Sequence, residues 1–565
     1  MAANGQARFR LRTNVSGLLG YTAIWAFLAL FLIYPLIRLF YDAFTTDAEA
    51  FTLMNFYDFF TDSYYLRALV NSLVLGAATV VTTSVIGITF AFLLLRYEFP
   101  GRGLFSFLSI LPMIMPPLVG VMGFVFILGR AGTVNVILMD YLGFTKPINF
   151  MYGIHGVLLV ETLHLFPLMT LSIVDAMGKI SPSLDEAAES VGSRGLRKFW
   201  DITFPLTTPG YVSGALLVFI WTFADFATPL VVGIDDLLAS QAYLNIVQFV
   251  DRRLFKMGIV ISAIMIVLAI LFLIVAKRYV AIKDYSSLSY SVIERKSLSL
   301  AGKIGTVVFL SGVLVFAFIP YLGIILDSFG RGWALTPFPV KYTLQYFYRV
   351  AIETPKFIYN SLLFSGIAVL VCIAVGVPIA WVMARTRLPG RELLDSLTTL
   401  ILALPGTGIG IAYLRAFRDP IPFLGTALIG MWIVVPLILG VRRLPYTVRG
   451  TFASLQIVHK SFEEAAESVG AKKLTTFKDV TLPLIWKGVL VGSLYSFILA
   501  LQEASATLLL VVPGHEMMPV GIFNFYIGGS VNEAAALGLI LIVLGATCLF
   551  VINKVTGTRT GGVFG

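Results

Sequence analysis

The chain has 565 residues, of which 58% are hydrophobic and 13% charged, and its mean hydropathy is +0.90. This balance excludes an ordinary soluble domain, which needs far more polar surface. The formal net charge of +10 is explained by Lys and Arg residues that flank apolar segments, so it does not indicate a nucleic-acid partner.

Continuous apolar runs of about 20 residues recur along the chain, and each is long enough for a helix to cross a hydrocarbon core. Lipid offers no hydrogen-bond partners, so a crossing segment must be a helix or part of a closed barrel. The runs do not alternate, and the sequence therefore predicts an all-α polytopic membrane protein. We expect twelve spans, near residues 17–40, 67–95, 104–128, 153–175, 210–233, 257–276, 303–326, 358–384, 393–416, 424–441, 488–512 and 533–553.

The distribution of charge between loops predicts the orientation of these spans. Arg8, Arg10 and Arg12 precede the first span, whereas the loop after that span contains Asp42 and Asp47. We therefore expect both termini in the cytoplasm. The first apolar run is too long for the core of a signal peptide, so we expect it to be retained as a membrane span.

Two segment pairs indicate an internal duplication. The stretch "NSLVLGAATVV" from Asn71 is similar to "NSLLFSGIAVL" from Asn360, and "EAAESVG" occurs identically at Glu186–Gly192 and Glu464–Gly470. Six spans per half keep both halves in the same orientation, which makes this a parallel repeat. We expect a first repeat at 1–276 with a cytoplasmic loop at 183–210, a cytoplasmic connector at 277–302, and a second repeat at 303–565 with a loop at 461–488.

Each "EAAESVG" copy has the pattern of a short amphipathic helix. Ser183 and Ser461 stand three residues before the first glutamate, which predicts a capping box in each copy. Gly192 and Gly470 are placed to end the helices in a left-handed conformation. One such helix could simply cap its own bundle. Two identical copies at matched positions favour a pair of docking helices for a partner with the same pseudo-twofold symmetry.

The pattern "EAA…G" followed by "TFPL" or "TLPL" resembles the EAA loop of ABC-importer permeases, the membrane components of binding-protein-dependent transport systems. The resemblance implies a bacterial inner-membrane subunit that transports but is not itself an enzyme. It also implies two copies of an ATP-binding subunit, which hold ATP and Mg, and a separate solute-binding protein. The residues that would couple to the ATPase are Glu186, Ala187, Ala188, Gly192, Glu464, Ala465, Ala466 and Gly470.

The fused double length is most similar to permeases for ferric iron, which makes iron the expected cargo. Permeases for thiamine, polyamines and organophosphonates or sugar phosphates remain alternatives. No G-x-x-x-x-G-K-[ST] phosphate loop occurs in the chain, which agrees with ATP hydrolysis by a separate subunit. Gly406, Gly408 and Gly410 in "PGTGIGI" lie inside an apolar span, where close packing or an unwound segment explains them better than a nucleotide.

Four titratable residues lie within the expected spans, where charge is costly and suggests function. They are Glu161, His164, Asp225 and Glu503, of which Asp225 and Glu503 are 278 residues apart and thus repeat equivalents. The three acids are candidate substrate-pathway residues, and Asp225 with Glu503 could coordinate a hard cation such as Fe³⁺. Alternatively, each acid binds a neighbouring polar group and fixes helix packing, and His164 is more readily explained in that way.

Prolines and glycines in "LPMIMPPLVG" and "LPGTGIGI" predict broken helices that line a cavity. The two cysteines, Cys372 and Cys548, are far apart and indicate neither a disulfide nor a thiolate metal site. A secondary transporter driven by an ion gradient is the competing class, with the same acids as proton or sodium sites. The duplicated halves fit that class equally well, but the matched helices do not, because such a carrier has no partner to dock.

Overall fold

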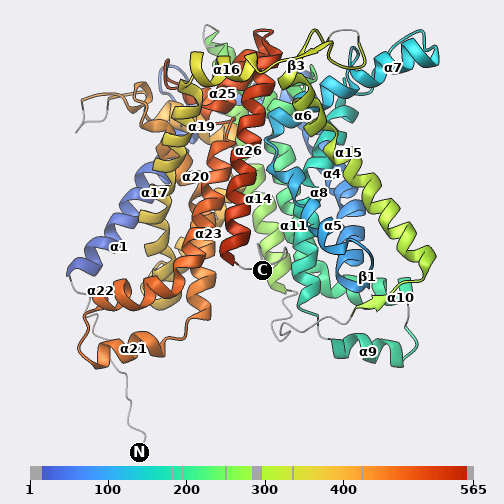
Figure 1. Ribbon diagram of the computed structural model, residues 1–565. Coiled ribbons are helices and arrows are strands. Elements are labelled where there is room, and N and C mark those ends of the chain that lie inside the picture. Colours follow the sequence, from blue (N-terminus) through green and yellow to red (C-terminus); the bar gives the residue numbers. More distant parts are fainter. Residues whose placement is uncertain are drawn as a thin grey trace, which may run out of the picture.

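The computed structural model describes residues 15–180, 182–193, 195–248, 251–282, 295–333, 336–420 and 425–556. Long helices run side by side through the molecule, and short helices gather at its two ends (Figure 1). In the first half the α-helices are α1 (Val15–Leu28), α2 (Tyr34–Ala43), α3 (Met54–Thr61), α4 (Ser63–Arg96), α5 (Arg102–Leu108), α6 (Pro117–Leu128), α7 (Thr133–Leu142), α8 (Ile154–Gly178), α9 (Pro182–Ser190), α10 (Gly195–Lys198), α11 (Phe204–Ala224), α12 (Ala227–Val231), α13 (Leu238–Val247) and α14 (Arg252–Ile282).

The second half repeats this order, and the connection between its α19 and α20 is shorter than that between α6 and α8. Its α-helices are α15 (Leu300–Phe329), α16 (Gln345–Tyr348), α17 (Lys356–Arg385), α18 (Arg391–Ala403), α19 (Gly406–Ala416), α20 (Val434–Ile457), α21 (Ser461–Ser468), α22 (Lys473–Thr476), α23 (Leu482–Leu501), α24 (Thr507–Leu510), α25 (Met518–Ile527) and α26 (Val531–Thr556). Short 3-10 or π segments are η1 (Ala29–Ile33), η2 (Leu111–Ile114), η3 (Phe199–Thr203), η4 (Arg349–Glu353), η5 (Leu428–Gly430) and η6 (Phe477–Thr481).

Strands are few in the described chain and lie outside the helical bundle. β1 (Tyr97–Glu98) pairs in parallel with β2 (Lys296–Ser297), and β3 (Gly330–Arg331) pairs antiparallel with β4 (Lys341–Tyr342). The first ladder attaches the end of the central connector to the first repeat. Because α14 continues to Ile282 and α15 begins at Leu300, the connector is shorter than the expected 277–302.

The all-α membrane architecture is confirmed. Ten helices of the described chain are long and apolar enough to cross a membrane, or up to eleven if α18 and α19, bent by 108°, count as one span. The expected span at 424–441 is wrong in its position, because the helix there, α20, occupies Val434–Ile457. Arg442, Arg443 and Arg449 lie within α20, and their charge removes it from the set of uniformly apolar helices.

The expected span at 104–128 is not one helix. It divides into α5, η2 and α6, because Pro112, Pro116 and Pro117 interrupt the helical hydrogen bonds. The matching break in the second half lies between α18 and α19, where Pro405 precedes the first residue of α19. The prediction of broken helices is confirmed at both places.

The first helix of each half packs against the other half. Figure 1 shows α1 beside α17 and α15 beside α4 and α6. Two hydrogen bonds attach α19 to the first half: Tyr413 Oη donates to the Phe31 carbonyl of η1 at 2.5 Å, and Tyr34 Oη of α2 donates to the Ala416 carbonyl at 3.2 Å. The largest buried apolar cluster accordingly contains residues from both halves.

Glycines allow the corresponding close approach of α15 to α6. A Cβ on Gly123 would overlap the backbone of Pro320, and a Cβ on Gly323 would overlap the backbone of Gly123. The two helices thus touch through their main chains. Because the first helix of each half packs against the other half, the two repeats form a single bundle.

Candidate functional site

Two exposed short helices lie at the same end of the molecule, α9 from the first repeat and α21 from the second (Figure 1). Gly192 and Gly470 follow them with φ of 83° and 96°, as expected for left-handed helix stops. The amide of Ser193 donates to the Ala188 carbonyl at 2.9 Å, and the amide of Ala471 donates to the Ala466 carbonyl at 3.1 Å. Both helices therefore end with the same backbone motif.

The predicted capping box is wrong for the second copy. Lys460 occupies the cap position in a helical conformation without a side-chain cap, and the Ser461 hydroxyl lies 2.8 Å from Nδ1 of His459 instead. The His459 ring also accepts the Ser461 amide at 3.3 Å, so it replaces the expected serine cap. The side chains of Ser183 and Glu186, which would form the first box, lie outside the described residues.

The apolar positions of these helices are open to contact. Val191 is 83% exposed and Val469 87%, while Leu184 and Phe462 are 37% and 55% exposed. Glu464 and Ala465 are exposed as well, and Ala466 is half-buried. In the first copy Ala187 is exposed but Ala188 is buried. The apolar stripe is thus largely uncovered by the chain's own bundle.

A buried ion pair fixes α21 to the bundle. Arg385, the last residue of α17, donates from Nε to Glu463 Oε1 at 2.9 Å, and the two side chains are only 9% and 13% exposed. A second nitrogen of Arg385 donates to the Val458 carbonyl at 2.7 Å. Thr481 Oγ1 donates to the same glutamate oxygen at 3.2 Å. These contacts connect α21 directly to the membrane helix α17.

The first helix, α9, is fixed by exposed charges instead. Glu189 Oε1 accepts from Lys296 at 2.5 Å and from Lys198 at 2.9 Å. These hydrogen bonds lower the pKa of Glu189 to about 2. Lys296 belongs to β2, and the neighbouring Arg295 pairs with Glu98 of β1 at 3.2 Å. The central connector thus contacts one of the two helices directly.

A cavity of about 160 Å³ lies inside the bundle and is lined by residues of both halves. All four of the titratable residues expected within the spans line it, namely Glu161, His164, Asp225 and Glu503. The first turns of α6 and α19 also reach it through Pro117, Leu118 and Gly406. The broken helices therefore line a cavity, as the sequence predicts.

The acidic residues of the first half form one group. Asp225 accepts the amides of Ala227 at 3.1 Å and Thr228 at 3.2 Å, so it caps the helix α12 that follows. Glu161 lies within interacting distance of Asp225 and accepts the Thr222 hydroxyl at 3.4 Å. His164 Nδ1 lies 3.1 Å from the Pro112 carbonyl, which agrees with a packed polar group. Asp225 thus has a structural role beside any role in transport.

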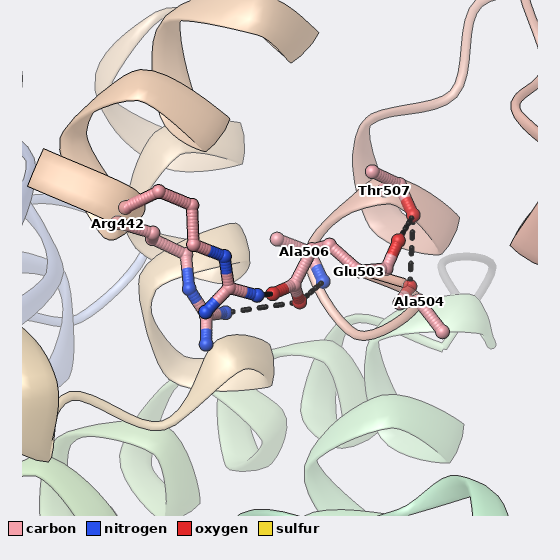
Figure 2. Close-up of polar contacts among 6 residues, drawn as sticks. Arg442, Glu503, Ala504, Ala506 and Thr507 are labelled. Carbon is pink, nitrogen blue, oxygen red and sulfur yellow. Dashed lines mark hydrogen bonds and ion pairs between the residues drawn. The ribbon is translucent and has the colours of Figure 1, made fainter. Parts of the chain in front are cut away.

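In the second half Glu503 faces two arginines (Figure 2). Its Oε1 accepts from Arg442 at 3.1 Å and from the Ala506 amide at 3.2 Å, and its Oε2 pairs with Arg443. Arg442 and Arg443 were missed by the sequence analysis, since the expected span ended just before them. The proline of α8, Pro167, and that of α20, Pro445, are 278 residues apart and would have aligned the two helices.

That alignment places Arg442 at the repeat position of His164, and Arg443 at that of Leu165. The two halves of the cavity are therefore chemically different. Within the described residues no group of three or more His, Cys, Asp or Glu side chains could hold a metal ion. Coordination of a metal by Asp225 and Glu503 stays a prediction, and it would require Glu503 to leave both guanidinium groups.

A duplicated helical bundle with a charged central cavity and two matched helices exposed at one end defines the membrane component of a transporter. Comparison with known families gives the same class. Residues 83–282 and 376–561 match the family described as "binding-protein-dependent transport system inner membrane component". The chain belongs to this family, and it is a fused, double-length permease of the ABC-importer type.

The relatives are named as permeases for different cargoes. The chain is 28% identical over 533 residues to the ferric transport system permease protein FbpB of Actinobacillus pleuropneumoniae, covering 93% of this chain and 76% of the relative. It is 27% identical over 487 residues to the putative ferric transport system permease protein FbpB 1 of Haemophilus influenzae, covering 85% and 76%. It is 33% identical over 162 residues to the molybdenum transport system permease protein ModB of Escherichia coli K12, covering 28% and 68%.

Proposed function

We propose that this chain is the translocation subunit of an ATP-driven importer located in a bacterial inner membrane, with both termini in the cytoplasm. A solute-binding protein delivers cargo at one face, and two copies of an ATP-binding subunit dock on α9 and α21 at the other. The observation that carries this proposal is the pair of matched helices with exposed apolar residues, Val191 at 83% and Val469 at 87%. A partner with two equal grooves would cover both.

Coupling follows from how the two helices are attached. When ATP draws the two ATPase subunits together, they move α9 and α21 toward each other. Arg385 and Thr481 connect α21 to α17 and to the π segment η6 that precedes α23. Both α17 and α23 pack against α20, which carries Arg442 and Arg443 of the cavity lining. The expected result is alternating access of the central cavity to the two sides of the membrane.

Ferric iron is the proposed cargo. Two relatives that each cover more than four-fifths of this chain are named as ferric permeases, which supports iron over the other cargoes. The three cavity acids, Glu161, Asp225 and Glu503, are hard oxygen donors of the kind that Fe³⁺ prefers. The molybdenum permease shares higher identity but over a much shorter part of the chain.

The test uses the complete transporter in proteoliposomes with its ATPase and binding protein. Glu464→Arg places a cation on the exposed docking face of α21, and we expect it to abolish the stimulation of ATPase by cargo-loaded binding protein. Glu392→Arg, the same charge change at an exposed position in the first turn of α18, is the matched control and should leave coupling through α21 intact. Unaltered coupling in Glu464→Arg would contradict the proposed docking. ATP-dependent uptake of ⁵⁵Fe³⁺ tests the cargo independently.

A further inference from the structure

Arg442 and Arg443 line the cavity inside the helical bundle, where a charged side chain needs a reason to be present. Their side chains are 13% and 12% exposed, and that of Glu503 is 4% exposed. Figure 2 shows the Arg442 guanidinium directed at the Glu503 carboxylate, whose other oxygen pairs with Arg443. Each guanidinium has five N–H donors, and Glu503 engages one nitrogen of each. Within the described residues the buried Nε of Arg443 has no hydrogen-bond partner, so binding capacity remains.

A further positive element adjoins this pair. The helix α19 begins at Gly406, and a Cβ on that residue would overlap the Arg442 guanidinium and the Ser505 side chain. Glycine therefore lets Arg442 lie against the first turn of α19. The amides of a first helical turn have no acceptor inside the helix and carry partial positive charge. Two guanidinium groups and a helix N-terminus thus meet at one wall of the cavity.

The fold does not need this arrangement, as the first repeat shows. There Asp225 occupies the position of Glu503 and caps α12 through two backbone amides, without any arginine. His164 and Leu165 stand where the second repeat has Arg442 and Arg443. Since the first repeat forms a short helix after its acid without the arginines, their role lies elsewhere. A carboxylate on two guanidinium groups indicates what they accept, because this geometry suits oxyanions.

We propose that Arg442, Arg443 and the first turn of α19 form an oxyanion subsite of the translocation cavity, and that the Glu503 carboxylate occupies it when no cargo is present. The ligand is a carboxylate, phosphate or metal-oxyanion group. Its source is either an anion that accompanies a ferric cargo or a cargo that is itself an oxyanion. That the subsite serves transport rests on the importer function proposed above, whereas anion binding by the chain does not.

Anion binding is measured on the full chain in lipid nanodiscs by calorimetry, with phosphate, citrate and molybdate as separate probes. Glu503→Gln removes the carboxylate that competes for the subsite. It is expected to raise the affinity for at least one probe roughly tenfold, which corresponds to the free energy of about one charge-assisted hydrogen bond. The double variant Arg442→Gln with Glu503→Gln removes one guanidinium together with the competing carboxylate and leaves Arg443 in place. It should lose the added affinity. Asp327→Asn is the matched control, because Asp327 is a buried carboxylate outside the cavity that accepts from Asn532, and it should not raise anion affinity.

Two results would overturn the subsite: no gain in anion affinity for Glu503→Gln in protein that unfolds at the wild-type temperature, or an equal gain for Asp327→Asn. Uptake by the complete transporter then separates the sources. Transport of ⁵⁵Fe³⁺ that requires citrate or phosphate indicates an accompanying anion, while uptake of ⁹⁹Mo-molybdate without iron uptake supports the subsite and refutes the ferric cargo. Iron uptake that is indifferent to added anion and to the double variant refutes the subsite and leaves the ferric proposal standing.

Discussion

Replacing Arg385 by alanine tests how α21 is attached to the membrane helices. Arg385 and Glu463 are 9% and 13% exposed, so the substitution leaves a largely buried carboxylate without its cation. Breaking one side of a buried pair costs about 3–5 kcal/mol. We take the lower value, about 3 kcal/mol, because Glu463 keeps the hydrogen bond from Thr481 at 3.2 Å. Since each 1.36 kcal/mol is a factor of ten, the detached population of α21 should rise roughly a hundredfold.

Hydrogen–deuterium exchange in nanodiscs measures that population directly on peptides that cover 461–470. We expect faster exchange there and a loss of ATPase coupling, while the long membrane helices stay protected. Arg391→Ala is the control, because Arg391 lies on the same side in an exposed position and donates to the Thr386 carbonyl at 3.3 Å. Equal exchange in the two variants, or no change in Arg385→Ala, would refute this mode of attachment.

Three further predictions concern other parts of the chain. Gly123→Ala should lower the Tm in detergent, since overpacking costs about 1–3 kcal/mol, whereas Gly312→Ala should not, because a Cβ added there would meet no atom within 4 Å. Gly470→Ala should weaken the end of α21 by about 1 kcal/mol, because φ is 96° there, and exchange at the following amides measures it. Lys296 and Lys198 together hold the pKa of Glu189 at about 2, so their contacts with its carboxylate are fully present above the ordinary glutamate pKa and lost as pH falls toward 2. The carboxyl ¹³C chemical shift of Glu189 should therefore stay constant from pH 6 down past the ordinary glutamate pKa and titrate only near pH 2.

Much of the architecture could be predicted because the bilayer restricts the solutions. Apolar length alone located the long helices, and identical letters at Glu186–Gly192 and Glu464–Gly470 revealed the repeat. The same criterion failed at α20, where Arg442 and Arg443 interrupt the apolar pattern inside a real helix. A hydropathy criterion cannot anticipate that Glu503, sixty residues later in the chain, neutralises them. The alignment of Pro167 with Pro445 would have located the helix α20 in the sequence, but it would not have identified Glu503 as the partner of the arginines.

The candidate sites show the same division between local and distant causes. Gly192 and Gly470 follow a local backbone rule, and their left-handed conformation was predicted correctly. The capping box at Ser461 is also a local rule, but His459 competes for the same amide and hydroxyl. Asp225 and Glu503, predicted to be repeat equivalents, both line the cavity, yet their surroundings differ because other helices supply the neighbours. Sequence patterns therefore located these residues but not their partners.

The exchanged first helices have a consequence for the synthesis of this protein. Tyr34 in α2 finds its hydrogen-bond partner, Ala416, 382 residues later in the chain. At about 5–20 residues per second, α2 remains without its final neighbours for roughly 20–75 seconds of translation. During that time Asp42 lacks Arg415, with which it pairs in the finished protein at 2.5 Å. A nascent first half is therefore an incomplete folding unit, and its recognition by membrane quality control would depend on how quickly the second half follows.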